Sequence, residues 1–131
     1  MKKLIFAMSS ALMLLSACQM DDSNTDYCLS YQTEPVTAVT PIPGVPAQEN
    51  NSFKVDFNST NGCGAFDSFD VTSDGNTRVI KVIGKYVGCV CTQDLPAREA
   101  TYTFTETTPG TYTLKFYQSD TAFITHTVVI P

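Results

Sequence analysis

The stretch Tyr112-Thr113-Leu114-Lys115-Phe116 alternates large apolar residues with polar ones, and this period of two decides the fold. Successive side chains of a β-strand point to opposite faces, so the three apolar residues share one face and can pack into a core. The polar residues between them point to the other face, toward water. The stretch therefore predicts a strand in a sheet that is buried on one side only.

The same alternation recurs along the chain and predicts an all-β domain. It appears around 53–58, 80–86 and 102–104, and a last strand is expected from Ala122 to Ile130. Residues that favour strands are abundant, and no window sustains the 3.6-residue apolar period of a helix. The candidate core residues are Phe53, Val55, Phe57, Ile80, Val82, Tyr86, Tyr102, Phe104, Tyr112, Leu114 and Phe116.

Turn-forming residues separate the expected strands at short intervals. Asn61-Gly62, Ser73-Asp74-Gly75-Asn76 and Pro109-Gly110 tolerate or fix the dihedral angles that turns require. Prolines interrupt 34–48, so we expect an edge strand over 36–40 followed by an extended crossover. Short strands at this spacing predict a small antiparallel β-sandwich, with a small β-barrel as the alternative.

The C-terminal third of the chain carries a resemblance to a known class of domain. Pro109-Gly110-Thr111-Tyr112-Thr113-Leu114 resembles the turn and penultimate strand of bacterial immunoglobulin-like domains. In those domains a tyrosine after the turn often occupies a corner, and a final strand similar to Thr127-Val128-Val129-Ile130 closes the sheet. The resemblance implies an immunoglobulin-like β-sandwich with Tyr112 near a corner.

The N-terminal segment has the features of a removable signal peptide. Lys2 and Lys3 precede an uncharged apolar run that is too short to cross a bilayer as a finished helix. The residues that close this run, Leu15-Ser16-Ala17-Cys18, resemble the lipobox of bacterial lipoproteins. That resemblance implies cleavage before Cys18 and acylation of this cysteine, with palmitate among the expected chains.

The lipobox divides the chain into three expected segments: a signal peptide over 1–17, a lipidated acidic tether over 18–26, and a single domain over 27–131. Gln19 stands where lipoproteins retained in the inner membrane of Gram-negative bacteria carry Asp. Asp21-Asp22 resembles the export signal of Bacteroidota surface lipoproteins. These resemblances imply a lipid anchor in the outer membrane, facing either the periplasm or the cell surface.

If Cys18 carries lipid, four of the five cysteines remain for the domain. An even number outside the cytoplasm favours two disulfides. Cys89 and Cys91 would lie on one face of an extended strand, with Cα atoms about 6.7 Å apart, so each can reach a different partner. We expect Cys28 and Cys63 each to bond one of these two, and the sequence leaves open which.

The same cysteines support a second hypothesis, a metal or redox site. Cys63, Cys89 and Cys91 with His126 would offer a soft ligand set suited to copper or zinc. Zinc sites prefer Cys-x-x-Cys spacing, which the chain lacks, and an oxidising compartment favours disulfides over free thiolates. Two disulfides are therefore the preferred interpretation.

Other kinds of chemistry have little support in the sequence. His126 is the single histidine, and the Gly-x-Ser-x-Gly motif of many hydrolases is absent, so we expect neither an enzyme nor a cofactor. Asp67, Asp70 and Asp74 beside Asn76 match no calcium loop, and we expect them to form turns. The 13 acidic and eight basic residues give a net charge of −5, which excludes nucleic-acid binding.

Together these features predict a lipid-anchored, non-enzymatic module of the cell envelope. Its membrane contact would be the lipid on Cys18, and an envelope protein or a glycan would bind to loops or to a sheet face. Tyr117, which we expect to be exposed, is a candidate contact residue, together with Tyr27 and Tyr31 near the tether. The alternative function is a metal or redox protein that uses the cysteines and His126.

Overall fold

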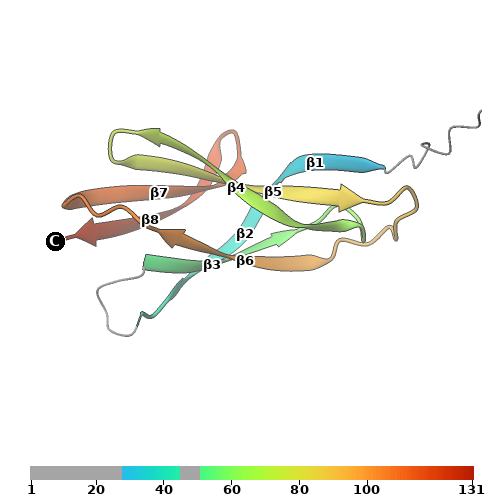
Figure 1. Cartoon of the computed structure of the whole chain (residues 1–131), viewed down its shortest axis with the longest axis horizontal. Helices are drawn as coiled ribbons and strands as arrows, with labels where there is room; N and C mark the ends of the chain where they lie inside the picture. Colours follow the sequence, from blue (N-terminus) through green and yellow to red (C-terminus); the bar gives the residue numbers. More distant parts are fainter. Residues whose placement is uncertain (1–27, 45–50) are drawn as a thin grey trace, which may run out of the picture.

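The computed structural model describes residues 28–44 and 51–131, and these residues form a domain of strands (Figure 1). Within the two ranges there are eight strands, and no described helix is long and apolar enough to cross a membrane. In chain order the strands are β1 (Leu29–Glu34), β2 (Val36–Ile42), β3 (Asn51–Asn58), β4 (Gly64–Asp74), β5 (Thr77–Val87), β6 (Ala97–Phe104), β7 (Gly110–Ser119) and β8 (Ala122–Ile130).

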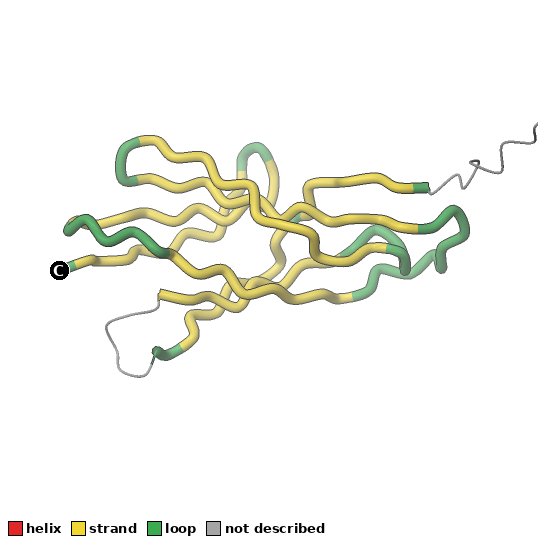
Figure 2. The backbone as a smooth tube through the Cα atoms, viewed as in Figure 1, coloured by secondary structure: helices red, strands yellow, loops and turns green. Residues whose placement is uncertain are grey.

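The strands form two sheets that pack as a β-sandwich (Figures 1 and 2). β5 lies at the centre of the larger sheet, with β4 along one edge and with β7 and then β1 along the other; β8 pairs with β7. The smaller sheet has the order β2-β3-β6. The predicted sandwich is confirmed, and the sheets do not close into the alternative barrel.

One pair of strands departs from the antiparallel arrangement that the sequence predicts. Thr77 to Ile80 of β5 pair in parallel with Thr113 to Phe116 of β7, whereas all other pairings are antiparallel. The chain between these two strands passes through β6 in the opposite sheet. Such a crossover returns the chain in its original direction, so β7 can only align parallel to β5.

Pro35 marks the point where the chain changes sheets. Glu34, just before it, pairs with Val82 in the larger sheet, and Val36, just after it, pairs with Phe57 in the smaller one. β2 lies at the edge of the smaller sheet and pairs with β3 alone, so the predicted edge strand is confirmed. The strand extends to Ile42, because an edge tolerates a proline that lacks its N–H.

The core is the one that the alternation predicts. Every candidate core residue is buried, and the structure adds Val36 and Val128. Aromatic side chains join the two sheets across this core: the ring centroids of Phe53 and Phe116 are 5.7 Å apart, and Tyr102 meets Phe116 edge-on at the same distance. Edge-on contacts of this kind are favourable in addition to the apolar area that they bury.

Three of the predicted local features also appear. β8 has the predicted bounds, and Gly75 turns the chain between β4 and β5 with a φ of 57°, a left-handed conformation that glycine adopts without strain. The Tyr112 hydroxyl donates a hydrogen bond of 2.8 Å to the carbonyl oxygen of Thr108. A bond from a tyrosine to the backbone a few residues upstream is the corner expected of an immunoglobulin-like sandwich.

Candidate functional site

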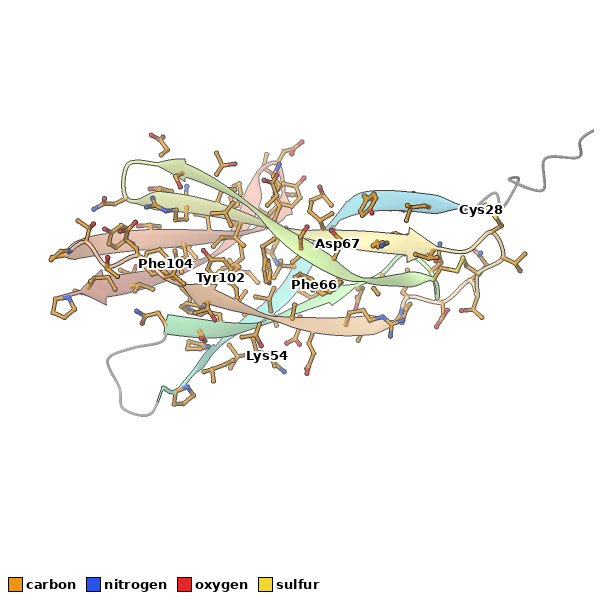
Figure 3. The ribbon with its side chains drawn as sticks, in the orientation of Figure 1. Cys28, Lys54, Phe66, Asp67, Tyr102 and Phe104 are labelled. Atoms are coloured by element: carbon orange, nitrogen blue, oxygen red, sulfur yellow. A yellow bond between two sulfur atoms is a disulfide. The ribbon has the colours of Figure 1, made fainter. Side chains whose placement is uncertain are left out.

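The two disulfides lie together at one end of the sandwich, which we call the disulfide end. Cys28 bonds Cys89 with their Cα atoms 4.9 Å apart, and Cys63 bonds Cys91 with their Cα atoms 5.4 Å apart. The expectation that Cys28 and Cys63 each take one member of the Cys89 and Cys91 pair is confirmed. Cys28 is labelled at this end in Figure 3.

Cys89 and Cys91 lie in a loop, so the extended strand assumed for them in the sequence is wrong. β5 ends at Val87, and Gly88 turns the chain with a φ of 127° into the segment 88–96, which we call the disulfide loop. Its backbone bonds the β3–β4 connection twice: the N–H of Gly62 donates to the Thr92 carbonyl at 2.9 Å, and that of Ser59 to the Pro96 carbonyl at 3.0 Å. Covalent and hydrogen bonds therefore hold this loop in place.

The disulfide end exposes four apolar side chains, which we call the apolar tip: Leu29, Val87, Val90 and Leu95. Val90 is 96% exposed and Leu95 is 70% exposed, and both belong to the disulfide loop. Leu29 and Val87 pair across β1 and β5, and about half of each is exposed. No pattern in the sequence predicted that these residues are exposed, although the position of Val90 between two cysteines was a signal that it lies on a cross-linked loop.

A buried polar cluster lies between the sheets. Glu34 is almost fully buried, and one of its carboxyl oxygens accepts a hydrogen bond from the Tyr86 hydroxyl. The same hydroxyl accepts a hydrogen bond of 2.8 Å from the backbone N–H of Thr60. Gly84 leaves the space that Glu34 needs, because a Cβ at this position would lie 2.5 Å from the carboxyl. Tyr86 thus links three segments of the chain.

The opposite end of the sandwich is held by polar contacts. Arg78 of β5 forms an ion pair of 3.3 Å with Glu106, which follows β6, and its guanidinium lies 5.4 Å from the centre of the Tyr112 ring. Hydrogen bonds from the backbone and side chain of Thr108 lower the pKa of Glu106, and Thr107 and Arg78 add to this effect. Burial raises the pKa of the nearby Tyr102, which the positive charge of Arg78 partly opposes. Arg78, Tyr102 and Glu106 line a shallow depression of about 330 Å³ beside β6.

His126 does not join the cysteines. It lies on β8, where its ring packs 5.2 Å from that of Phe53 and 6.2 Å from that of Phe116. The sulfurs of the hypothetical thiolate cluster form the two disulfides. Over residues 28–44 and 51–131, no three His, Cys, Asp or Glu side chains lie close enough to hold a metal ion.

The acidic candidates lie along β4. Asp67 accepts a hydrogen bond of 2.9 Å from the neighbouring Ser68 hydroxyl, and Asp74 ends the strand at the β4–β5 turn. Asn76, in that turn, donates to the carbonyl of Thr111 at 3.1 Å and so ties the turn to β7. Asp70 pairs in register with Lys81 of β5. Asp67 and Asp70 thus lie within an edge strand, which corrects the expectation that they form turns, and only Asp74 and Asn76 stand at the turn.

The tyrosine candidates differ in exposure. Tyr31 of β1 is 53% exposed. Tyr117 is partly buried, which corrects the expectation of an exposed ring: its hydroxyl donates to Asp120 at 3.1 Å, and Lys81 lies 4.9 Å from the ring centre. That hydrogen bond, together with burial and the negative charge of Asp120, raises the pKa of Tyr117. Tyr27 and Cys18 lie outside the described residues.

The fold and its cross-links define a disulfide-linked β-sandwich domain. The model of one family, the ORF11 beta-sandwich domain, matches residues 53–129, which is more than half of the chain. The chain therefore belongs to this family. No curated protein and no solved structure matches the chain.

Proposed function

We propose that the protein is a lipid-anchored lipoprotein of the outer membrane whose sandwich serves as a non-enzymatic binding or structural module. The observation that carries the proposal is the distribution of the cysteines. The chain has five, and four of them pair within the domain. The fifth, Cys18, ends the segment that resembles a lipobox, where a single cysteine receives the lipid.

The disulfides support export from the cytoplasm. Two cross-links in one small domain are typical of proteins that fold in an oxidising compartment. Several acyl chains on one cysteine would give durable anchoring, because each buried CH₂ contributes about 0.8 kcal/mol. Membrane attachment would then require nothing from the sandwich, whose loops and sheet faces stay free to bind an envelope protein or a glycan.

Replacing the lipid acceptor tests the anchor. The Cys18→Ser variant is expected to leave the membrane fraction and to lose incorporation of labelled palmitate. Ser23→Ala, a change in the same polar segment but outside the lipobox, is the matched control and is expected to behave as the wild type. If Cys18→Ser stays in the membrane fraction to the same extent as the control, the lipid anchor is wrong.

Protease treatment tests the side of the membrane. Asp21-Asp22, which resembles a surface-export signal, supports display on the outer face. Added protease is then expected to remove the domain from intact cells. Cleavage only after rupture of the outer membrane would place the domain in the periplasm and contradict display.

A further inference from the structure

The segment that leads to the proposed lipid enters the domain at the disulfide end. Cys28, the first described residue, is bonded to Cys89 there (Figure 3). A residue adds at most about 3.6 Å to the reach of a chain, so Cys18, ten residues earlier, stays within about 36 Å of Cys28 in any conformation. The opposite end lies further from the anchor, because β5, with 11 residues, alone spans roughly 35 Å toward that end. Anchoring at Cys18 thus favours encounters of the disulfide end with the bilayer.

The apolar tip lies at this same end and is held in place. Val90, the most exposed large apolar side chain described, stands between Cys89 and Cys91, which are bonded to different segments. Because these bonds fix the loop before any contact forms, little conformational freedom is lost when its side chains are bound. The loop also contains one acidic residue, Asp94. Its carboxylate has a partner within the loop, because it accepts a hydrogen bond of 2.6 Å from the Thr92 hydroxyl.

An amphipathic pair adjoins the apolar tip on the outer face of the larger sheet. Tyr31 pairs in register with Lys85, and this pair lies two positions from the pair Leu29 and Val87, on the same face of the sheet. Lys85 belongs to no ion pair among the described residues. Tyrosine favours the boundary between lipid and water, and lysine places its ammonium among anionic headgroups while its stem covers apolar surface. The surface is therefore apolar at the tip and amphipathic behind it, which matches the change from acyl chains to headgroups in a bilayer.

We propose that the disulfide end is a membrane-contact surface. Leu29, Val87, Val90 and Leu95 enter the boundary between headgroups and acyl chains of the bilayer that holds Cys18, and Tyr31 and Lys85 meet the headgroups. The sandwich then stands on the membrane by one end and presents the opposite end, with the β4–β5 turn and the C-terminus, to the surroundings (Figure 1). This inference rests on the proposed lipid anchor.

Single tryptophans at the two ends test the contact, because the natural chain contains no tryptophan. Val90→Trp places the probe in the apolar tip, and Val129→Trp is the matched control, since Val129 is 65% exposed near the C-terminus on β8. Both lipidated proteins are reconstituted into vesicles of zwitterionic and anionic lipid with brominated acyl chains. V90W is expected to show blue-shifted, strongly quenched emission, and V129W is expected to show neither effect.

Equal emission and quenching of the two variants on vesicles would overturn the inference. A blue shift of V90W that appears only when outer-membrane proteins are added would also overturn it, because the tip would then bind a protein. The mass of each variant is measured first: an acylated Cys18 with an unquenched V90W refutes only the membrane contact. A Cys18 without lipid refutes the proposed function instead.

A measurement on the natural side chains complements the probe, since tryptophan itself favours interfaces. Amide hydrogens of 88–95 in the wild type are expected to exchange more slowly on vesicles than in the unanchored Cys18→Ser protein, while those of the β4–β5 turn exchange equally. The double variant Val90→Asp with Leu95→Asp keeps Cys18 and is expected to lose this protection. Protection that persists in the double variant, or that never appears in the wild type, would contradict the contact.

Discussion

The two ends of the sandwich are stabilised by different means. At the disulfide end, two covalent cross-links fix a loop whose apolar side chains point into solvent. At the opposite end, the Arg78 and Glu106 ion pair and the Tyr112 corner bond join the strands through their own polar groups. Because covalent bonds hold the disulfide end, its apolar residues can stay exposed. The exposed residues are then available for the contact with the bilayer that we propose.

Removing one cross-link is expected to have the largest effect on this comparison. Cys63 and Cys91 are 28 residues apart, and the chain-entropy model gives a closed loop of this size about 3 to 4 kcal/mol of stabilisation. The variant Cys63→Ser with Cys91→Ser should lose that amount in the free energy of urea unfolding. A midpoint and slope equal to those of the wild type would show that the disulfide end does not depend on its cross-links.

Replacing Tyr86, which lies nearer the disulfide end, is expected to have the next largest effect on stability. Tyr86→Phe leaves the buried carboxyl of Glu34 and the N–H of Thr60 without their shared hydroxyl partner. Buried polar groups without partners are costly, so we expect a loss of about 2 to 3 kcal/mol in urea unfolding. Tyr31→Phe, on an exposed ring, is the control and should change stability by less than about 0.5 kcal/mol. Similar values for both variants would refute the role of the cluster.

The corresponding change at the opposite end is expected to cost less. Tyr112→Phe removes one hydrogen bond, the one to the carbonyl of Thr108. A single neutral bond of this kind contributes about 1 kcal/mol, so Y112F should lie between the wild type and Y86F in the same unfolding experiment. A larger loss for Y112F than for Y86F would reverse the comparison of the two ends.

The smallest expected effect depends on pH. The pKa of Glu106 is lowered from its ordinary value of 4.5, so its ionised form stabilises the folded domain. This contribution is complete above the unfolded-state pKa and disappears as the pH falls through the lower pKa of the folded state. The gap in thermal midpoint between wild type and Glu106→Gln should therefore be greatest near neutral pH and close in acid. A gap that widens in acid would contradict the assignment.

The sequence predicted the parts of the fold that depend on local pattern. Leu114 and Phe116 are buried because side chains alternate along any strand, and β8 begins and ends where its apolar pattern does. The parallel pairing of β5 with β7 depends on the path of the chain through the other sheet, which no local pattern contains. The burial of Glu34 likewise depends on the change of sheet at Pro35 and on the space above Gly84.

The candidate site was predicted only in part, because its arrangement also depends on where distant segments of the chain lie in space. Compartment and spacing were enough to expect that Cys28 and Cys63 bond the two clustered cysteines, but the choice of partner depends on where β1 and the β3–β4 connection lie in space. The exposure of Val90 and Leu95 depends on what the rest of the fold leaves uncovered. Valine and leucine in a sequence are ordinarily assigned to a core, so their exposure at the disulfide end is visible only in the structure.

The lipid anchor and the two disulfides are tested together by the mass of the intact, non-reduced protein after treatment with a thiol-alkylating reagent. A lipid-anchored sandwich with two disulfides should give a chain that begins at Cys18, carries the mass of its acyl groups, and takes up no alkylating reagent. A chain that begins at Met1 or a Cys18 without lipid would contradict the lipid anchor, and alkylation at any of the four domain cysteines would contradict the disulfides.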